Sequence, residues 1–179
     1  MSSYLKTYSG LHIDPLDPKT EEIRLKDIAH ALSLICRGAG QVTHFYSVAQ
    51  HCLNCEREAE ARGLSRRLRL ACLLHDASEA YLNDIIRPVK QYLPEYKKAE
   101  DYFLKVIYER FGLGDLREDE WQTVREIDDA LLAYDLVELL HEPMPDGGYQ
   151  FKITPDIGEK SFEEVENAYI EKANFLMSV

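Results

Sequence analysis

The sequence lacks a long apolar run and an excess of basic residues. No stretch of the 179 residues is apolar for long enough to cross a bilayer, and Met1-Ser2-Ser3-Tyr4 has no basic or apolar character of a secretory leader. We therefore expect a cytoplasmic protein with no membrane partner. Lys and Arg number 21 against 32 Asp and Glu, a net charge of −11. Binding along a nucleic-acid backbone needs a basic stripe, so we also expect no nucleic-acid partner.

Repeats, low-complexity tracts and linkers rich in Gly, Ser or Pro are also absent from the sequence. The chain is 45% hydrophobic and 30% charged, which is typical of a globular protein with a core of its own. We therefore expect one domain over residues 1–179.

Cysteine is scarce, with four residues at positions 36, 52, 55 and 72. Cys52 and Cys55 have the spacing of zinc ligands, and His51 immediately precedes Cys52. A structural zinc site usually has four ligands, and the sequence has no second CxxC and no HxxxH pair. We therefore expect reduced thiols that face the core.

Apolar residues spaced three or four apart predict an all-α fold, a compact bundle of about six helices. Gly63 and Gly112 suit helix ends, Ser65 suits an N-cap, and Pro88 should stop the third helix soon after Asp84. Gly and Pro residues in segment 8–18 predict a short irregular or hairpin N-terminus, and those in segment 142–155 predict a loop or short hairpin. The expected helices are about 26–36, 45–62, 65–82, 94–111, 118–141 and 158–177.

The run His75-Asp76-Ala77-Ser78-Glu79 is the most informative segment for function. In a helix with about 100° per residue, His75, Asp76 and Glu79 fall within one arc of roughly 100°. An imidazole and two carboxylates in one small volume suit a divalent cation with a proton acceptor beside it. A His-Asp pair alone is also typical of a capped or solvated helix end, so further ligands are needed for the metal interpretation.

Further candidates occur on the second and fifth expected helices. His51 ends the run Ser47-Val48-Ala49-Gln50-His51, and Asp128 and Asp129 lie within an apolar helical pattern. A buried acid or imidazole costs several kcal/mol unless it is paired or ligated, and one shared metal would satisfy all of these groups. We favour Asp128 over Asp129 as the ligand because it lies nearer the apolar arc of its helix.

Together these residues resemble the HD-domain metal-dependent phosphohydrolases, in which separated His, His-Asp and Asp elements bind one metal. His51 resembles the first His of that motif, His75-Asp76 the doublet and Asp128 the last Asp. The resemblance runs from about residue 27 to residue 140 and includes Asp84-Ile85-Ile86-Arg87-Pro88-Val89-Lys90, which is similar to a segment of small bacterial and phage members.

The resemblance is nearest to the bacterial 5′-deoxynucleotidases of this family. It implies catalytic roles for Glu79 and Asp84 and a phosphate-binding role for Arg37. The chain departs from those enzymes in having Gly38 after the arginine, where they carry a large aromatic residue. It has Ala80 where the alarmone hydrolases have a second acid. Binuclear members have extra histidines between the His-Asp doublet and the last Asp, and this chain has none between His75 and Asp128. We therefore expect a mononuclear site.

The expected activity is metal-dependent hydrolysis of (deoxy)nucleoside 5′-monophosphates. One divalent ion, Mn, Co, Ni, Fe or Mg, would leave about two of six coordination positions for water and a phosphate oxygen. Arg37, Arg87 and Lys90 are the candidate substrate cations. Two alternatives stay open: a deoxynucleoside triphosphate triphosphohydrolase, and a nucleotide- or metal-binding module without turnover. A homodimer or higher homo-oligomer is also open.

Overall fold

A computed structural model describes residues 4–144, 146, 148 and 150–178. Helices make up most of this part of the chain. They follow a short antiparallel hairpin of β1 (Leu5–Lys6) and β2 (His12–Ile13), in which Leu5 pairs with Ile13. The prediction of a mostly helical protein with a short N-terminal hairpin is confirmed. None of the helices in the described residues is both long enough and apolar enough to cross a membrane.

Two short 3-10 helices, η1 and η2, accompany the α-helices. The elements after the hairpin are η1 (Thr20–Glu22), α1 (Leu25–Leu34), η2 (Arg37–Gly40), α2 (Val48–Ala61), α3 (Arg66–Leu74), α4 (Glu79–Leu82), α5 (Arg87–Lys90), α6 (Pro94–Arg110), α7 (Glu118–Leu140) and α8 (Phe162–Met177). Each of the six expected helical segments contains at least one helix, and most of these helices begin or end a few residues from the expected positions.

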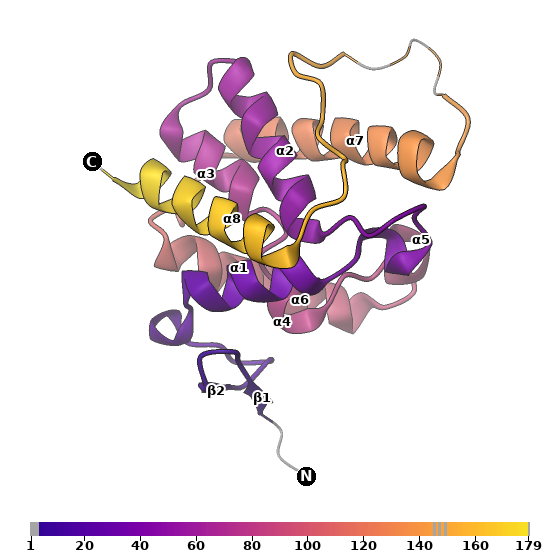
Figure 1. Ribbon diagram of the computed structural model, residues 1–179. Helices are drawn as coiled ribbons and strands as arrows, with labels where there is room; N and C mark the ends of the chain where they lie inside the picture. The colour runs from indigo at the N-terminus through magenta and orange to yellow at the C-terminus, as the bar shows by residue number, and fades with distance from the viewer. Residues whose placement is uncertain (1–3, 145, 147, 149, 179) are drawn as a thin grey trace.

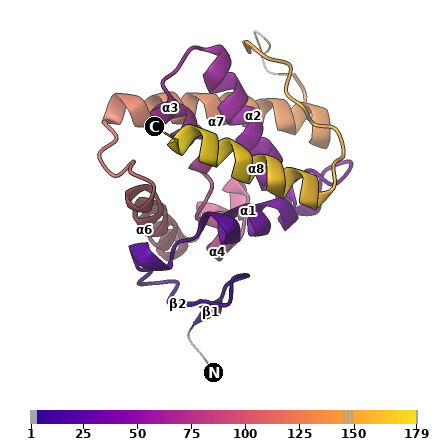
Figure 2. The ribbon, with the colours of Figure 1, turned by 60° about the vertical axis from the view of Figure 1, so that its left-hand side comes forward.

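Helix α2 lies in the middle of the bundle. It contacts α1, α3, α7 and α8, and Figure 2 shows α7 behind it and α8 in front of it. Its buried residues include Val48, Ala49, Cys52, Cys55 and Ala59, which recur three or four apart and so line the sides of the helix that face its neighbours. A polar side chain on these sides is therefore enclosed by other helices.

The start of α2 is fixed by a reciprocal cap. The Ser47 hydroxyl accepts from the backbone N–H of Gln50, whose side-chain oxygen accepts from the Ser47 N–H. An isolated β-bridge between Cys36 and Ser47, with the Arg37 N–H donating to the Tyr46 carbonyl at 2.8 Å, ties the preceding segment to this cap. Arg37 is thereby held near the first turn of α2.

The expected third helix, 65–82, is broken. Helix α3 begins at the Ser65 cap, as predicted, but ends at Leu74, and residues 75–78 form turns. In these turns the Glu79 N–H bonds to the carbonyl three residues earlier, tighter than the α-helical pattern. Helix α4 then ends at Leu82, and the residue that follows, Asn83, has a φ of 72°. The prediction that Pro88 ends this helix is wrong: Pro88 lies in the first turn of α5, where its missing N–H costs no helical hydrogen bond.

The segment expected to be a loop, 142–155, has no regular helix or strand in its described residues, while Pro145, Gly147 and Tyr149 lie outside them. Its second half is attached to α2 by side chains. The Glu58 carboxylate accepts from the N–H groups of Lys152 and Ile153. This attachment holds the chain alongside α2 as it leads into α8 (Figure 1).

Candidate metal centre

His51 is fully buried on α2, one turn after the Ser47 cap. Its Nδ1 lies 2.9 Å from Oδ2 of Asp135 and its Nε2 lies 3.1 Å from Oδ1 of Asp128, both on α7. A carboxylate can only accept a hydrogen bond, so the Asp135 contact places a proton on Nδ1. In the neutral ring, Nε2 then carries a lone pair directed at Asp128, which is the arrangement of a metal-binding histidine oriented by a carboxylate.

His75 has the same arrangement at the end of α3. Its Nδ1 lies 2.8 Å from the carbonyl oxygen of Cys72, which fixes the proton on Nδ1. The Nε2 atom is buried and has no hydrogen-bond partner among the described residues. It lies 3.2 Å from Asp76 Oδ2 and 3.4 Å from Asp128 Oδ1, at angles that do not make hydrogen bonds. A buried lone pair close to two carboxylates needs a cation.

The His–Asp cluster is formed by His51, His75, Asp76 and Asp128. One ligand atom from each lies within 4.8 Å of all the others, so the four could hold one metal ion. The donor set of two imidazole nitrogens and two carboxylate oxygens suits a divalent first-row metal. The structure brings Asp128 into the cluster, while the side chain of Asp129 is 60% exposed and pairs with Arg87.

The electrostatics of the cluster point to the same need for positive charge. Burial and Arg37 lower the pKa of His51, but Cys55 and the hydrogen bonds to Asp128 and Asp135 outweigh them and raise it well above its usual value. Burial raises the pKa of Asp128, but the hydrogen bond from His51 and the nearby charge of His75 lower it well below the usual range. The cluster therefore favours a positive charge, either as protons on the histidines or as a bound cation.

Arg37 lies in η2, beside the cluster, and is nine-tenths buried. Its NH1 is 3.3 Å from Asp76 Oδ2 and its Nε is 3.8 Å from Asp135 Oδ2. The next residue, Gly38, has φ of 60°, a left-handed conformation that large side chains rarely adopt. A large side chain at position 38 would therefore be strained.

The side chain of Glu79, at the start of α4, is buried, and its Oε2 has no hydrogen-bond partner within the described part of the chain. Burial raises the pKa of Glu79 well above its usual value, and the charges of Asp76 and Asp84 raise it further. Asp84 is half-buried, and its pKa is also raised, chiefly by burial. Once it has accepted a proton, Glu79 can therefore hold that proton more readily than an ordinary surface glutamate.

Arg87 and Lys90, on α5, are both paired with acids near the cluster. Arg87 NH2 lies 3.0 Å from Oδ2 of Asp128, and its side chain is 57% exposed. Lys90 Nζ lies 2.7 Å from Oε1 of Glu100 on α6 and 3.7 Å from Oε1 of Glu79. An anionic ligand would have to compete with these carboxylates for either cation.

Asp135 is the residue of the site that the sequence did not single out. It is 3% exposed on α7 and accepts the hydrogen bond that orients His51. The available signal was its position seven residues after Asp128, which puts both acids on one side of the helix. A carboxylate among the buried apolar residues of that side requires a partner.

All four cysteines are free thiols. Three of them, Cys52, Cys55 and Cys72, are buried as expected, whereas Cys36 is only half-buried. Cys55 lies close to the cluster, with Sγ 3.5 Å from His51 Nε2. Cys55, His51 and His75 form a second group whose ligand atoms all lie within 4.8 Å of one another.

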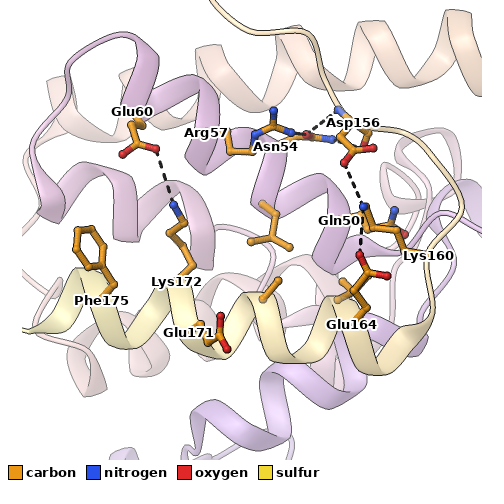
Figure 3. A pocket seen from close by; sticks show the side chains of 13 residues that line it. Gln50, Asn54, Arg57, Glu60, Asp156, Lys160, Glu164, Glu171, Lys172 and Phe175 are labelled. Carbon is orange, nitrogen blue, oxygen red and sulfur yellow. Dashed lines mark hydrogen bonds and ion pairs between the residues drawn. The ribbon is translucent and has the colours of Figure 1, made fainter.

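A groove of about 680 Å³ lies away from this cluster, between α2 and α8 (Figure 3). Leu53 and Val165 give it an apolar lining, while Lys172, paired with Glu60 across 3.8 Å, lies among charged side chains of both signs. No residue of the His–Asp cluster lines it. The groove and the cluster are therefore separate features of the two sides of α2.

No protein-family model matches the chain. The chain is 42% identical over 111 residues to the uncharacterized protein YfdR of Escherichia coli, an alignment that covers 62% of this chain and 60% of the relative. It is also 42% identical over 117 residues to an uncharacterized protein of Rhodobacter capsulatus, covering 62% of this chain and 59% of the relative. The chain thus aligns with about three fifths of the length of each of these relatives.

Proposed function

We propose that this protein is an HD-domain, metal-dependent phosphohydrolase that acts on nucleotides, with nucleoside 5′-monophosphates as the first class of substrate. The observation that carries the proposal is the buried meeting of His51, His75, Asp76 and Asp128, whose ligand atoms lie within 4.8 Å of one another. Both histidines have Nδ1 engaged and Nε2 directed into the cluster. Such oriented imidazoles beside carboxylates are typical of catalytic metal sites.

A divalent ion in this cluster would polarise a phosphate oxygen and lower the pKa of a nearby water. Glu79 accepts the proton of the attacking water as the new P–O bond forms and the bond to the nucleoside 5′-oxygen breaks. The departing oxygen then takes up a proton from Glu79 or from solvent. The Oε2 atom of Glu79, which is buried without a hydrogen-bond partner in the described part of the chain, supports this role, and Asp84 is the reserve acceptor.

Arg37 binds the non-bridging phosphate oxygens in this proposal. Its guanidinium lies 3.3 Å from Asp76, so an anion bound to the cluster would be within its reach. Arginine suits this task because its planar fork can donate two parallel hydrogen bonds and keeps its charge. The same contact neutralises charge that builds up on the phosphate in the transition state.

A triphosphohydrolase activity on deoxynucleoside triphosphates is the second candidate. It is favoured by the position of Arg87, which reaches Asp128 from α5 with an exposed side chain, and by Lys90 on the same helix. These two cations would extend the basic lining for a longer phosphate chain. Each would exchange a carboxylate partner for a phosphate oxygen.

One screen separates these functions. Purified protein is incubated with Mn²⁺, Co²⁺, Ni²⁺, Fe²⁺ or Mg²⁺ and with nucleoside mono-, di- and triphosphates, and phosphate, pyrophosphate and triphosphate are resolved. Inorganic phosphate from monophosphates supports the first proposal, and triphosphate release supports the second. Tight nucleotide binding without turnover under every metal would contradict both and favour a binding module. An Asp128→Ala protein serves as the control for contaminating phosphatases.

A further inference from the structure

Cys55 shares one side of α2 with His51. It follows His51 by four residues, about one helical turn, so both side chains face the same neighbours. Its Sγ lies 3.5 Å from His51 Nε2, and the residue is 1% exposed. A ligand nitrogen of His75 lies within 4.8 Å of both, and the Nε2 of this side chain, which is 7% exposed, is buried and has no hydrogen-bond partner among the described residues. The thiol therefore lies beside two nitrogens that are both oriented as ligands.

The two histidines thus belong to two donor sets. One set adds the carboxylates of Asp76 and Asp128, and the other adds the thiol of Cys55. The carboxylate side chains are 17% and 21% exposed, whereas Cys55 is 1% exposed, so the carboxylate set reaches solvent and the thiol is enclosed. Oxygen donors favour hard ions such as Mn²⁺ and Mg²⁺, and thiolate favours thiophilic ions such as Zn²⁺.

We propose that His51 and His75 also form, with Cys55, a binding site for a thiophilic metal ion that excludes the ion held by Asp76 and Asp128. Zn²⁺ is the expected occupant. Binding replaces the S–H bond of Cys55 by a sulfur–metal bond and releases the thiol proton to solvent, because a coordinating thiol is deprotonated. Both sets need the lone pair of His51 Nε2, which faces Cys55 and Asp128 alike, and both need His75, so only one ion can be fully ligated at a time.

This site would determine which metal ion His51 and His75 bind, and it does not depend on the proposed hydrolysis. Zinc held by Cys55 would leave both carboxylates of the His–Asp cluster without their ion. It would therefore act as an inhibitor of any chemistry that needs that ion. The site also differs from a structural CxxC zinc site, because Cys52 is not part of the donor group that contains Cys55.

Cobalt is the first probe, because thiolate-bound Co²⁺ has a charge-transfer band in the near ultraviolet. The wild-type protein, kept reduced without added thiols, is titrated with Co²⁺. We expect this band to saturate at one ion per chain, to disappear in Cys55→Ser and to persist in Cys52→Ser. Cys52 is the matched control because it is a buried cysteine on the same helix.

Two results overturn the proposal. One is a wild-type protein that binds Co²⁺ without the band. The other is loss of the band in Cys52→Ser with retention in Cys55→Ser. A further measurement needs no variant: X-ray absorption of the zinc-loaded wild type should give one sulfur neighbour at about 2.3 Å and nitrogens at about 2.0–2.1 Å. A zinc shell of nitrogen and oxygen alone would refute Cys55 as a ligand even if its variants did not fold.

Competition between Mn²⁺ and Zn²⁺ tests whether the two sites exclude each other. Mn²⁺ bound to the wild type is followed by electron paramagnetic resonance while Zn²⁺ is added. We expect one Zn²⁺ to release one Mn²⁺, and we expect Cys55→Ser to keep its Mn²⁺ affinity while needing more Zn²⁺ for the same release. Simultaneous binding of both ions would contradict a shared pair of histidines. These readouts use no substrate, so a failed activity screen would leave this result intact.

Discussion

Asp135→Asn tests whether a carboxylate behind His51 sets the metal affinity of the cluster. The Asp135 Oδ2 to His51 Nδ1 contact is 2.9 Å long, and the two side chains are 4% and 0% exposed. A hydrogen bond to a charged group contributes about 1.5–3 kcal/mol, which corresponds to about 10- to 150-fold in an equilibrium. Asparagine keeps an oxygen acceptor but loses the charge, so the expected loss of Mn²⁺ affinity is about 10- to 100-fold.

The assay is calorimetric titration of metal-free protein with Mn²⁺ at fixed pH and ionic strength, after circular dichroism has verified the helical content. Asp129→Asn is the matched control, because it removes the same charge from the same helix at an exposed position. It should bind Mn²⁺ nearly as tightly as the wild type. If Asp135→Asn also binds as tightly but is less stable to heat, Asp135 serves only to pair with Arg37 and the reasoning is refuted.

Three further predictions concern the same residues. Asp128→Ala should lose bound metal and the thermal stabilisation that metal gives, whereas Asp129→Ala should keep both; elemental analysis and melting curves decide, and the reverse pattern would exchange their roles. Glu79→Gln should keep metal and nucleotide affinity but slow turnover about 10²- to 10⁴-fold, while Arg37→Ala should weaken nucleotide binding as well, as measured by calorimetry and initial rates. The pKa of both cluster histidines is raised in the metal-free protein, so protons compete with the metal below those pKa values. Metal affinity should therefore rise with pH, and metal binding should release protons. A binding enthalpy that is the same in buffers of different ionisation enthalpy would contradict this proton release.

The spacing of apolar residues predicted most helices, because the apolar side that a helix buries can be recognised within a short stretch of sequence. Ser65 was predicted as a cap for the same reason, since a cap acts within its own first turn. The break after Leu74 escaped prediction because turns of three residues per repeat keep nearly the same apolar spacing as an α-helix. Pro88 was misjudged because proline is compatible with the first turn of a helix as well as with its end.

The grouping of His51, His75, Asp76 and Asp128 was predicted from residue types at separated positions and from the family resemblance, whereas the surroundings of these four residues were not predicted. Contacts such as Asp135 with His51, or Cys55 with His75, join residues whose nearness depends on how α2, α3 and α7 pack. The sequence gives each residue a side of its helix but not the residue that faces it. The pairings of Arg87 and Lys90 with acids are of the same kind.

The most direct test of the metal centre is a crystal of the protein soaked with Mn²⁺ and measured for anomalous scattering. We predict one strong peak per chain, bounded by Nε2 of His51 and His75 and by carboxylate oxygens of Asp76 and Asp128. Elemental analysis of the same protein should give about one ion per chain, because the sequence has no histidine between His75 and Asp128 for a second. Two tight ions, or a peak away from these four side chains, would contradict the account.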